Sequence, residues 1–417
     1  MRLPSPLSRG RFLGLLLLVT TVAFSLRVAL ADRFVGLDSP PDAGAHYDQV
    51  DYEALADHLA AGRGYIREDG RPTAFRSPGT ALTLAPVYVA AGRERWLGRL
   101  WFSLLSAATC ALAGLLTARA LGHWPGVLAA TFLALHPGHA YYALHFLSET
   151  PFAFWLTLAA LLADHGLRGE GSRRAAGLAG LALGLAVLTR PQALLVLPLA
   201  GIVPLLAPAA TRRRRVPLAL LVLGTVLPLG LWVARNQVQL GHAVVSTVGG
   251  CTFWGAHNEV VVADPGRIGD WIEVTSLPAW EQVRGDDEVE VDRRCWEQGK
   301  AFVRDQPGLL PRLVGWKLVR LFDPLPFPTN PPLNAAIGLT WLVQAPLLLI
   351  GLVFLRRRDR LLFALVVLPL LSLLATTVLF YGSARFRQGY VGLLVVPAAA
   401  GAAALVERVR GRREPAA

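Results

Sequence analysis

Apolar runs of about twenty residues recur along most of this chain, and each is long enough to cross a bilayer hydrocarbon core of about 30 Å. Hydrophobic residues make up 53% of the 417 residues, and charged residues only 17%. In a soluble domain of this size, about a quarter of the residues are charged. The sequence therefore predicts an all-α polytopic membrane protein with about ten transmembrane helices.

The predicted spans are separated by short loops except at two places, where long polar segments intervene. The spans are Phe12–Leu30, Leu97–Arg119, Val127–Tyr142, Thr150–Leu167, Ala175–Leu188, Gln192–Ala207, Val216–Val233, Leu333–Leu355, Leu361–Phe380 and Gly389–Val406. A shorter apolar stretch, Ala81–Ala91, is typical of a re-entrant or interfacial helix. We expect an N-terminal transmembrane module (residues 1–235, with a first outer loop at 32–96), an outer segment (236–332), and C-terminal transmembrane helices with a basic tail (333–417).

Arginine gathers in the short loops between the spans, which is the mark of the cytoplasmic side. The clusters are Arg168 with Arg173 and Arg174, Arg212–Arg215, Arg356–Arg358 with Arg360, and Arg408, Arg410, Arg412 and Arg413. We therefore expect a multi-pass protein of the cell membrane with both termini cytoplasmic and both polar segments outside. The formal net charge of +12 comes with these loops, so it indicates contact with the lipid bilayer and no nucleic-acid partner.

The first span has an alternative interpretation as a cleaved signal peptide. Arg2, Arg9 and Arg11 precede or open the apolar stretch, and Ala29-Leu30-Ala31 resembles a cleavage site. The many later spans favour an uncleaved first helix.

The polar stretch from Asp42 to Thr80 dominates the first outer loop. A one-sided helix is predicted by the i, i+3, i+4, i+7 spacing of Tyr52, Leu55, Ala56 and Leu59. Asp48 stands at its start and Gly62 at its end, as capping residues do. Asp48 and Asp51 are explained equally well as residues that cap the helix and as a general base for an acceptor hydroxyl. His46 is a further candidate base.

Four arginines lie at the outer ends of spans, where the charge rule does not explain them: Arg190, Arg235, Arg385 and Arg387. Each alone can reach the lipid headgroups or pair with a carboxylate of the loops. Together they indicate a shared anionic ligand, and phosphate fits because the planar guanidinium binds its oxygens in a bidentate way.

Two further residues join this group of candidates. Arg76 precedes the turn that leads into the interfacial helix, and its structural alternative is a headgroup contact. Glu149 stands at the start of a span, where Ser148 fits an N-cap and Pro151 an early helical position. Glu149 can instead bond to an arginine across the cavity.

The outer segment is polar enough to fold outside the membrane as a small mixed unit. Its predicted elements are β-like runs at Val244–Thr247 and Val260–Val262, a turn at Gly249-Gly250, a helix at Asp286–Asp305 and a membrane-surface helix at Leu309–Phe322. Cys251 and Cys295 both lie in this segment. The sequence leaves open whether they form a disulfide or stay as two free thiols. His136, His139 and His145 match no standard ligand spacing, so no metal site is predicted there. Recruitment of a divalent cation by aspartates in a phosphate-binding cavity stays open.

The stretch Asp-x-x-x-Tyr-x-x-Leu-Ala-x-x-Leu-x-x-Gly-x-Gly-Tyr at Asp48–Tyr65 resembles the first outer loop of family 39 and related C-type glycosyltransferases. These include protein O-mannosyltransferases and the aminoarabinose transferases that act on lipid A. Further similar stretches follow in order over nearly the whole chain: Arg76-Ser-Pro-Gly, Leu147-Ser-Glu-Thr, Gly184-Leu-Ala-Val-Leu-Thr-Arg-Pro, Ala234-Arg-Asn, Ser246-Thr-Val-Gly-Gly and Arg385-Phe-Arg.

The resemblance implies a C-type fold and transfer of a sugar from a polyprenyl-phosphate donor to an extracytoplasmic acceptor, with inversion. Asp48 matches the acidic residue that acts on the acceptor in that family. Cations must then stabilise the leaving lipid phosphate. The candidates are Arg76, Arg190, Arg235, Arg385 and Arg387, with Asp51 and Glu149 also expected at the substrate site. Protein mannosyltransferases typically show Asp-Glu where this chain has Asp48-Gln49, which favours a lipid or glycan acceptor.

Two other functions use the same outer arginines. A lipid-linked glycan polymerase or ligase is one. A transporter or flippase of a lipid-linked anion is the other, and it predicts charges near the bilayer midplane and related halves. No internal repeat is visible and the charges lie at span ends, so the transferase interpretation is favoured.

Overall fold

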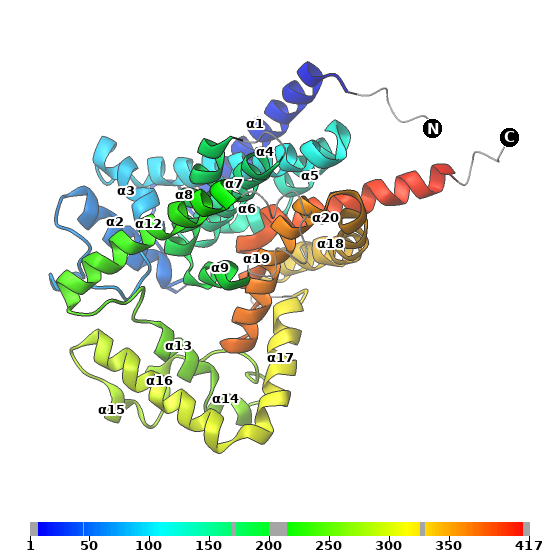
Figure 1. The fold of residues 1–417 in the computed structure, drawn as a ribbon. Helices are drawn as coiled ribbons and strands as arrows, with labels where there is room; N and C mark the ends of the chain where they lie inside the picture. The colour runs from blue at the N-terminus through cyan, green and yellow to red at the C-terminus, as the bar shows by residue number, and fades with distance from the viewer. Residues whose placement is uncertain (1–6, 45, 169–171, 200–214, 326–329, 412–417) are drawn as a thin grey trace.

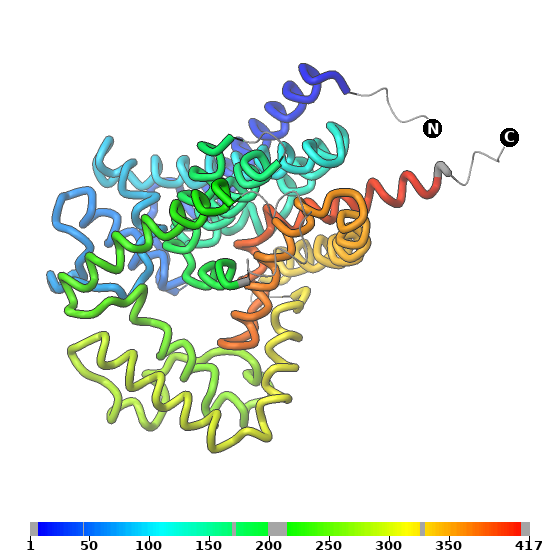
Figure 2. Tube along the Cα trace, viewed as in Figure 1, coloured from blue at the N-terminus to red at the C-terminus, as the bar shows by residue number. Residues whose placement is uncertain are grey.

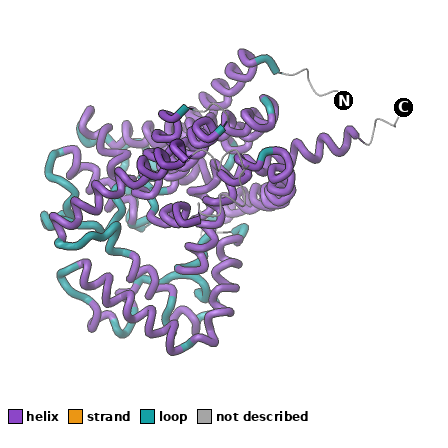
Figure 3. Tube along the Cα trace, viewed as in Figure 1, coloured by secondary structure: helices purple, strands orange, loops and turns teal. Residues whose placement is uncertain are grey.

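Helices account for every regular element in the parts of the chain that the computed structural model describes, which are residues 7–44, 46–168, 172–199, 215–325 and 330–411. Within these ranges no strand forms, which agrees with the expected all-α class (Figure 3). Among the described residues, six helices are long and apolar enough to span a bilayer. They are α1 (Arg9–Phe34), α4 (Arg95–Leu121), α12 (Arg215–Leu240), α18 (Pro331–Arg358), α19 (Arg360–Leu379) and α20 (Ala384–Gly411). Six of the predicted spans thereby fall on membrane-length helices.

The remaining predicted spans lie on shorter helices. The span predicted at Val127–Tyr142 is two helices, α5 (His123–Ala134) and α6 (Pro137–Ala143), because Pro137 has no amide hydrogen and starts a new helix. The spans predicted at Thr150–Leu167 and Ala175–Leu188 are helices α7 (Glu149–Leu167) and α8 (Arg173–Thr189). The span predicted at Gln192–Ala207 begins as the short helices η1 (Pro191–Leu195) and α9 (Val196–Leu199), and residues 200–207 lie outside the described ranges.

The long helices pack in pairs around a shared apolar core (Figure 1). Helix α8 packs along both α7 and α12, and α18 packs along α20. The α8–α12 contact depends on small residues, because a Cβ added at Gly180 would lie 2.1 Å from the carbonyl oxygen of Leu221. This close packing brings the ends of α7, α8 and α20 together at one end of the bundle, where the candidate site lies.

The first loop (residues 35–94, between α1 and α4) contains the predicted one-sided helix, α2 (Asp48–Ala60). Leu55 and Ala56 are buried in a cluster with the side chains of α3 (Gly79–Ala91), the short apolar helix. Gly62 follows the end of α2 with a φ of +70°, a conformation that residues with a Cβ adopt only with strain. The helix therefore starts at Asp48 and stops before Gly62, as predicted, but its N-cap residue is Tyr47.

The insert (residues 241–330, between α12 and α18) is helical in its described part, with an apolar core of its own (Figure 1). It contains α13 (Gly249–Ala256), α14 (Glu259–Ala263), η3 (Val274–Ser276), α15 (Trp280–Val283), α16 (Glu288–Asp305), η4 (Pro307–Leu309) and α17 (Leu310–Phe322). The helices expected at Asp286–Asp305 and Leu309–Phe322 are confirmed as α16 and α17.

The β-like runs and the turn expected in the insert were wrong. Val244–Thr247 has no regular structure, and Val260–Val262 lies in α14, which the Asn258 side chain caps by accepting from the Val261 amide. Gly249 and Gly250 open helix α13 and form no turn. Gly250 lies close to α16, where a Cβ would be 2.0 Å from the Asp292 carbonyl oxygen. Val261 thus packs in the apolar core of the insert, whereas Val244 packs against the cluster of α2 and α3.

The insert lies beside one end of the bundle, whereas the start of α1 and the end of α20 project from the opposite end (Figure 2). This arrangement is consistent with the prediction that the two ends of the chain share a side and the insert occupies the other. Which side faces the cytoplasm stays a prediction.

Candidate functional site

Six of the eight candidate side chains form one ionic cluster between the first loop and the helical bundle. They are Asp48, Asp51, Arg76, Glu149, Arg190 and Arg385. Three carboxylates alternate with three guanidinium groups, so the cluster is close to neutral overall. Paired in this way, ionised groups can be partly buried at modest cost.

Arg76 is held between the two aspartates of α2. Its Nε donates to Oδ2 of Asp51 at 2.8 Å, and its Nη2 lies 3.0 Å from Oδ1 of Asp48. The guanidinium also lies over the Phe75 ring, 5.1 Å from the ring centroid. The first loop therefore presents Arg76 as a fixed cation to the first turn of α2.

Arg385 and Arg190 complete the cluster from the bundle. Nη2 of Arg385, in the first turn of α20, donates to Oδ2 of Asp48 at 2.9 Å, and Nε of Arg385 donates to Glu149. Glu149 is also 2.9 Å from Nη1 of Arg190, the residue that ends α8. The Glu149 side chain is only 1% exposed, so its charge depends on these two arginines.

The capping explanations for Asp48 and Glu149 fail in this structure. Tyr47 occupies the N-cap position of α2, and Ser148 that of α7, but neither side chain makes a capping hydrogen bond. Asp48 and Glu149 are the first residues of their helices, and their carboxylates point to arginines of other elements. Both carboxylates therefore pair with arginines of other elements and do not cap their own helices.

The two aspartates of α2 differ in proton affinity. Burial raises the pKa of Asp48, but Arg385 and Arg76 lower it by more, and the pKa lies below the ordinary aspartate value. Burial also raises the pKa of Asp51, and its one close cation, Arg76, does not reverse the shift. Asp48 is accordingly ionised over a wider range of pH than Asp51.

Two cavities meet at Phe75 and Arg76. The first, of about 530 Å³, is lined by Asp48, Arg190 and Arg385, with apolar side chains of η1 and the insert around them. We call it the arginine cavity. The second, of about 470 Å³, lies between α2 and the segment 66–76 and is lined by Asp51 and His58 among other polar residues. We call it the loop cavity.

A narrow apolar groove of about 120 Å³ runs beside the arginine cavity, between α7, α8, α12 and α19. Leu194 and Leu195 of η1 line the arginine cavity, and Val196 and Leu197 of α9 line the groove. The residues that line the apolar groove therefore follow directly in the chain after residues that line the arginine cavity.

Arg235 and Arg387 lie outside the ionic cluster. Arg235 donates to the backbone oxygens of Thr73 at 2.8 Å and Tyr65 at 2.6 Å, so it supports the first loop from α12. Arg387 lies over the ring of Trp341, 4.0 Å from the centroid, and donates to the Asp323 carbonyl. The structure thus gives neither residue a contact with the acidic side chains of the cluster.

Of the histidines near the site, His46 and His145 pack edge to face with ring centroids 5.4 Å apart, and the others have separate partners. His46 contacts the Tyr141 hydroxyl at 2.9 Å, His139 bonds to Ser106, and His136 caps α6. Within the described ranges, no three His, Cys, Asp or Glu side chains are grouped so as to hold a metal ion. The two aspartates of the cluster, Asp48 and Asp51, already have Arg76 between them.

Sequence reasoning missed residues that shape the cavities without carrying charge. Phe75 lines both cavities, and Tyr52, which was expected only as an apolar residue of α2, lines the arginine cavity. The position of Phe75 next to Arg76 was the one available signal. Tyr381, also on the cavity wall, follows the end of α19 and had no signal in the sequence.

Comparisons with known proteins agree with this geometry. Residues 55–239, less than half of the chain, match the family model of dolichyl-phosphate-mannose-protein mannosyltransferase. The matched region begins within α2 and ends in α12, so it includes Arg76, Glu149 and Arg190 of the cluster. A comparison with curated protein sequences gives no match.

Similar solved structures include the archaeal oligosaccharyltransferase AglB from Archaeoglobus fulgidus in complex with an inhibitory peptide and a dolichol-phosphate. It is 14% identical, with a TM-score of 0.54 over 96% of this chain and 51% of that chain. The same enzyme in complex with Zn and sulfate is 14% identical with a TM-score of 0.56, over 95% of this chain and 50% of that chain. ArnT from Cupriavidus metallidurans bound to undecaprenyl phosphate is 15% identical with a TM-score of 0.42, over 95% of this chain and 78% of that chain.

At these identities the likeness to AglB is one of fold, and this chain spans about half the length of that enzyme. The TM-score with ArnT is too low to support an argument. The matched family is a mannosyltransferase family, and AglB is an oligosaccharyltransferase. The chain is thus a multi-pass helical protein with the C-type membrane glycosyltransferase fold, as its sequence motifs predicted.

Proposed function

We propose that this protein is an inverting membrane glycosyltransferase that moves a sugar from a polyprenyl-phosphate donor to an acceptor hydroxyl on the insert side of the bilayer. The observation that carries the proposal is the contact of Asp48 with Arg385 and Arg76, in a cavity that Arg190 also lines. A candidate base and three cations for a leaving phosphate meet there. On this assignment, the insert side is the extracytoplasmic side.

In the proposed reaction, Asp48 accepts the proton of the acceptor hydroxyl while the hydroxyl oxygen bonds to the anomeric carbon. The bond from that carbon to the phosphate oxygen breaks, and the lipid phosphate leaves with the electron pair. Arg190 and Arg385 stabilise the charge that develops on the phosphate. Attack on the face opposite the leaving group inverts the configuration.

The resting ion pairs have a consequence for this mechanism. A donor phosphate competes with the carboxylates of Asp48 and Glu149 for Arg385. When Arg385 turns to the phosphate, Asp48 loses one of the two cations that hold its pKa down. The proton affinity of Asp48 then rises when a base is required.

The apolar groove offers an aliphatic surface to the part of the polyprenyl tail next to the phosphate. Its lining is almost wholly aliphatic, and α9, which lines it, directly follows the residues of η1 that line the arginine cavity. A polyprenyl phosphate can therefore place its charged head on the arginines and its chain in the groove. The loop cavity, on the far side of Phe75 and Arg76, is then the route by which the acceptor approaches Asp48.

The proposal is tested by turnover of a labelled polyprenyl-phosphate sugar by purified protein in lipid. We compare the unaltered chain with Asp48→Asn and with the control Asp57→Asn, whose aspartate lies on the same helix and pairs with Arg63. Loss of a general base lowers the rate by about 10²- to 10⁴-fold, so Asp48→Asn is expected to lose turnover while it still binds the donor. Asp57→Asn is expected to remain active.

Two outcomes would contradict the proposal. Full activity in Asp48→Asn would exclude Asp48 as the base. Donor binding by the unaltered protein without release of lipid phosphate, with any lipid, glycan or protein acceptor, would exclude a transferase. Movement of the labelled donor across the bilayer would then indicate a flippase.

A further inference from the structure

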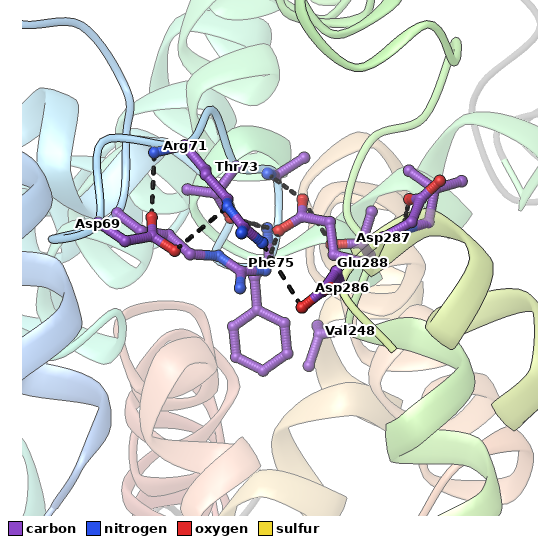
Figure 4. A network of polar contacts seen from close by, with 12 residues as sticks. Asp69, Arg71, Thr73, Phe75, Val248, Asp286, Asp287 and Glu288 are labelled. Atoms are coloured by element: carbon purple, nitrogen blue, oxygen red, sulfur yellow. Dashed lines mark hydrogen bonds and ion pairs between the residues drawn. The ribbon is translucent and has the colours of Figure 1, made fainter. Parts of the chain in front are cut away.

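Glu288, the first residue of α16, makes the densest set of polar contacts between the insert and the first loop (Figure 4). Its carboxylate accepts from the Ala74 amide at 2.6 Å, from Oγ1 of Thr73 at 2.7 Å and from Oγ1 of Thr247 at 3.1 Å. It also accepts from the guanidinium of Arg67. The Glu288 side chain is 9% exposed, so these bonds are largely shielded from water.

The neighbouring backbone strengthens this junction. The Thr247 amide donates to the Ala74 carbonyl at 3.1 Å, and Oγ of Ser246 donates to the Phe75 carbonyl at 3.2 Å. The Phe75 amide in turn donates to Oγ1 of Thr73 at 3.0 Å. Residues 73–75 are thereby fastened to residues 246–247, with the Glu288 carboxylate at the centre.

Helix capping does not account for Glu288. The N-cap of α16 is Asp287, whose side chain accepts from the amides of Val289 and Glu290. An acidic residue in the first turn gains a general benefit from the helix dipole, but that benefit needs no particular partner. The Glu288 side chain instead leaves its own helix and crosses to the first loop, as Figure 4 shows.

The fastened residues lead directly into the site. Phe75 and Arg76 follow Ala74 and form the wall that the arginine cavity and the loop cavity share. Arg235 holds the same segment from the bundle side, through the carbonyls of Tyr65 and Thr73. The backbone that carries Arg76 is therefore fixed from α12 by one charged residue and from the insert by another.

We propose that Glu288 is a positioning residue, which holds Arg76 between Asp48 and Asp51 by tying residues 73–75 to the insert. The inference deepens the proposed function and rests on it for its effect on catalysis. Glu288 touches neither substrate in this scheme. It acts only through the placement of Phe75 and Arg76, and the insert thereby controls the wall between the two cavities.

The first test measures the tie without reference to catalysis. Amide hydrogen exchange is followed for peptides that cover residues 66–76, in the unaltered protein, Glu288→Ala and Glu288→Gln. Asp286→Asn is the control. Asp286 is two residues from Glu288, its side chain is 97% exposed, and its ion pair with Arg71 is long, at 3.7 Å. Glu288→Ala is expected to speed exchange in this segment, and Glu288→Gln less so, since the amide oxygen still accepts from Ala74. Unchanged exchange in Glu288→Ala would overturn the tie.

The second test measures the consequence for the reaction. A displacement of about 1 Å of a catalytic group lowers the rate by about 100-fold, so Glu288→Ala is expected to lower kcat by that order with a smaller change in KM for the donor. Glu288→Gln is expected to retain part of the rate, and Asp286→Asn all of it. Faster exchange with unaltered kcat would show that the tie is structural only and would overturn the positioning role.

A double-mutant cycle separates action through Arg76 from other effects. If Glu288 acts through Arg76, the fall in kcat caused by Glu288→Ala is expected to vanish in an Arg76→Ala background. Full additivity of the two losses would contradict the proposal. Absence of turnover in the unaltered protein would contradict the proposed function, whereas the exchange experiment would still decide whether the tie exists.

Discussion

Nη2 of Arg385 donates to Oδ2 of Asp48 at 2.9 Å, although the two residues lie 337 positions apart. The last long helix thus reaches the first-loop helix, and Glu149 of α7 shares the same guanidinium. No single segment of the chain contains the site. The base that we propose on α2, Asp48, contacts Arg385 only when the C-terminal helices have packed behind it.

Arg385→Lys is expected to lower kcat by about 100-fold, the usual loss when one stabilising donor is removed from a developing negative charge. A lysine is a single point charge, so it cannot bond to Asp48 and Glu149 together as the planar guanidinium does. The measurement is single-turnover release of the lipid phosphate. The control is Arg284→Lys, an exposed pair with Glu281 in the insert, and equal activity of the two variants would contradict the role.

The acid limb of the pH–rate profile distinguishes the two aspartates. The base must be unprotonated, so activity is present above its pKa and lost as the pH falls through it. The pKa of Asp48 lies below the ordinary aspartate value of about 3.9. We therefore expect kcat/KM, which reports on the free enzyme, to hold down to below about pH 4. Loss of activity already at a pH above the ordinary aspartate pKa would point to Asp51 as the base, because burial raises the pKa of Asp51.

Removal of divalent cations is expected to leave turnover unchanged. The Arg76 guanidinium lies between Asp48 and Asp51, so it already supplies the positive charge that a metal ion would bring to this carboxylate pair. The measurement is turnover in a chelator compared with turnover in added magnesium or manganese. Loss of activity in the chelator, with recovery on addition of either ion, would contradict the expectation.

The two cysteines of the insert, Cys251 and Cys295, are free and buried in one apolar cluster. The sequence left their pairing open. We expect mild oxidation to join them and to raise the free energy of unfolding by about 2–4 kcal/mol, because the bond closes a loop in the unfolded chain. Counting of free thiols before and after oxidation tests this, with Cys251→Ser as the control. An unchanged number of free thiols in the unaltered protein after oxidation would contradict it.

Because Lys317 on α17 is buried, we expect the free energy of unfolding to rise as the solution becomes more alkaline. Its side chain is buried, its Nζ lies 2.8 Å from Nε2 of His257 and 3.1 Å from the Val378 carbonyl oxygen, and burial lowers its pKa to about 7. An unfolded lysine keeps a pKa of about 10.4, so between these values the unfolded chain binds more protons and stability rises with pH. Thermal unfolding from pH 7 to pH 10 measures the slope. Lys317→Met is expected to flatten it, and an unaltered slope would contradict the assignment.

The sequence alone predicted the membrane class, the long helices and the first-loop helix, because apolar periodicity and capping are local properties. It also named every member of the ionic cluster. Residue type and position relative to the spans sufficed for that. The helices of the insert at Asp286–Asp305 and Leu309–Phe322 were predicted for the same reason.

Only the tertiary structure decided which candidates meet. Arg385 and Arg387 stand two positions apart on α20, and a helix turns by about 200° over two residues, so one faces Asp48 and the other Trp341. Arg235 proved to bind backbone oxygens of the first loop, and Glu288, which no motif indicated, fastened the same segment. Pattern along a chain fixes which face of a helix is apolar. Ion pairs between elements hundreds of residues apart depend on how those helices rotate against one another when the core packs.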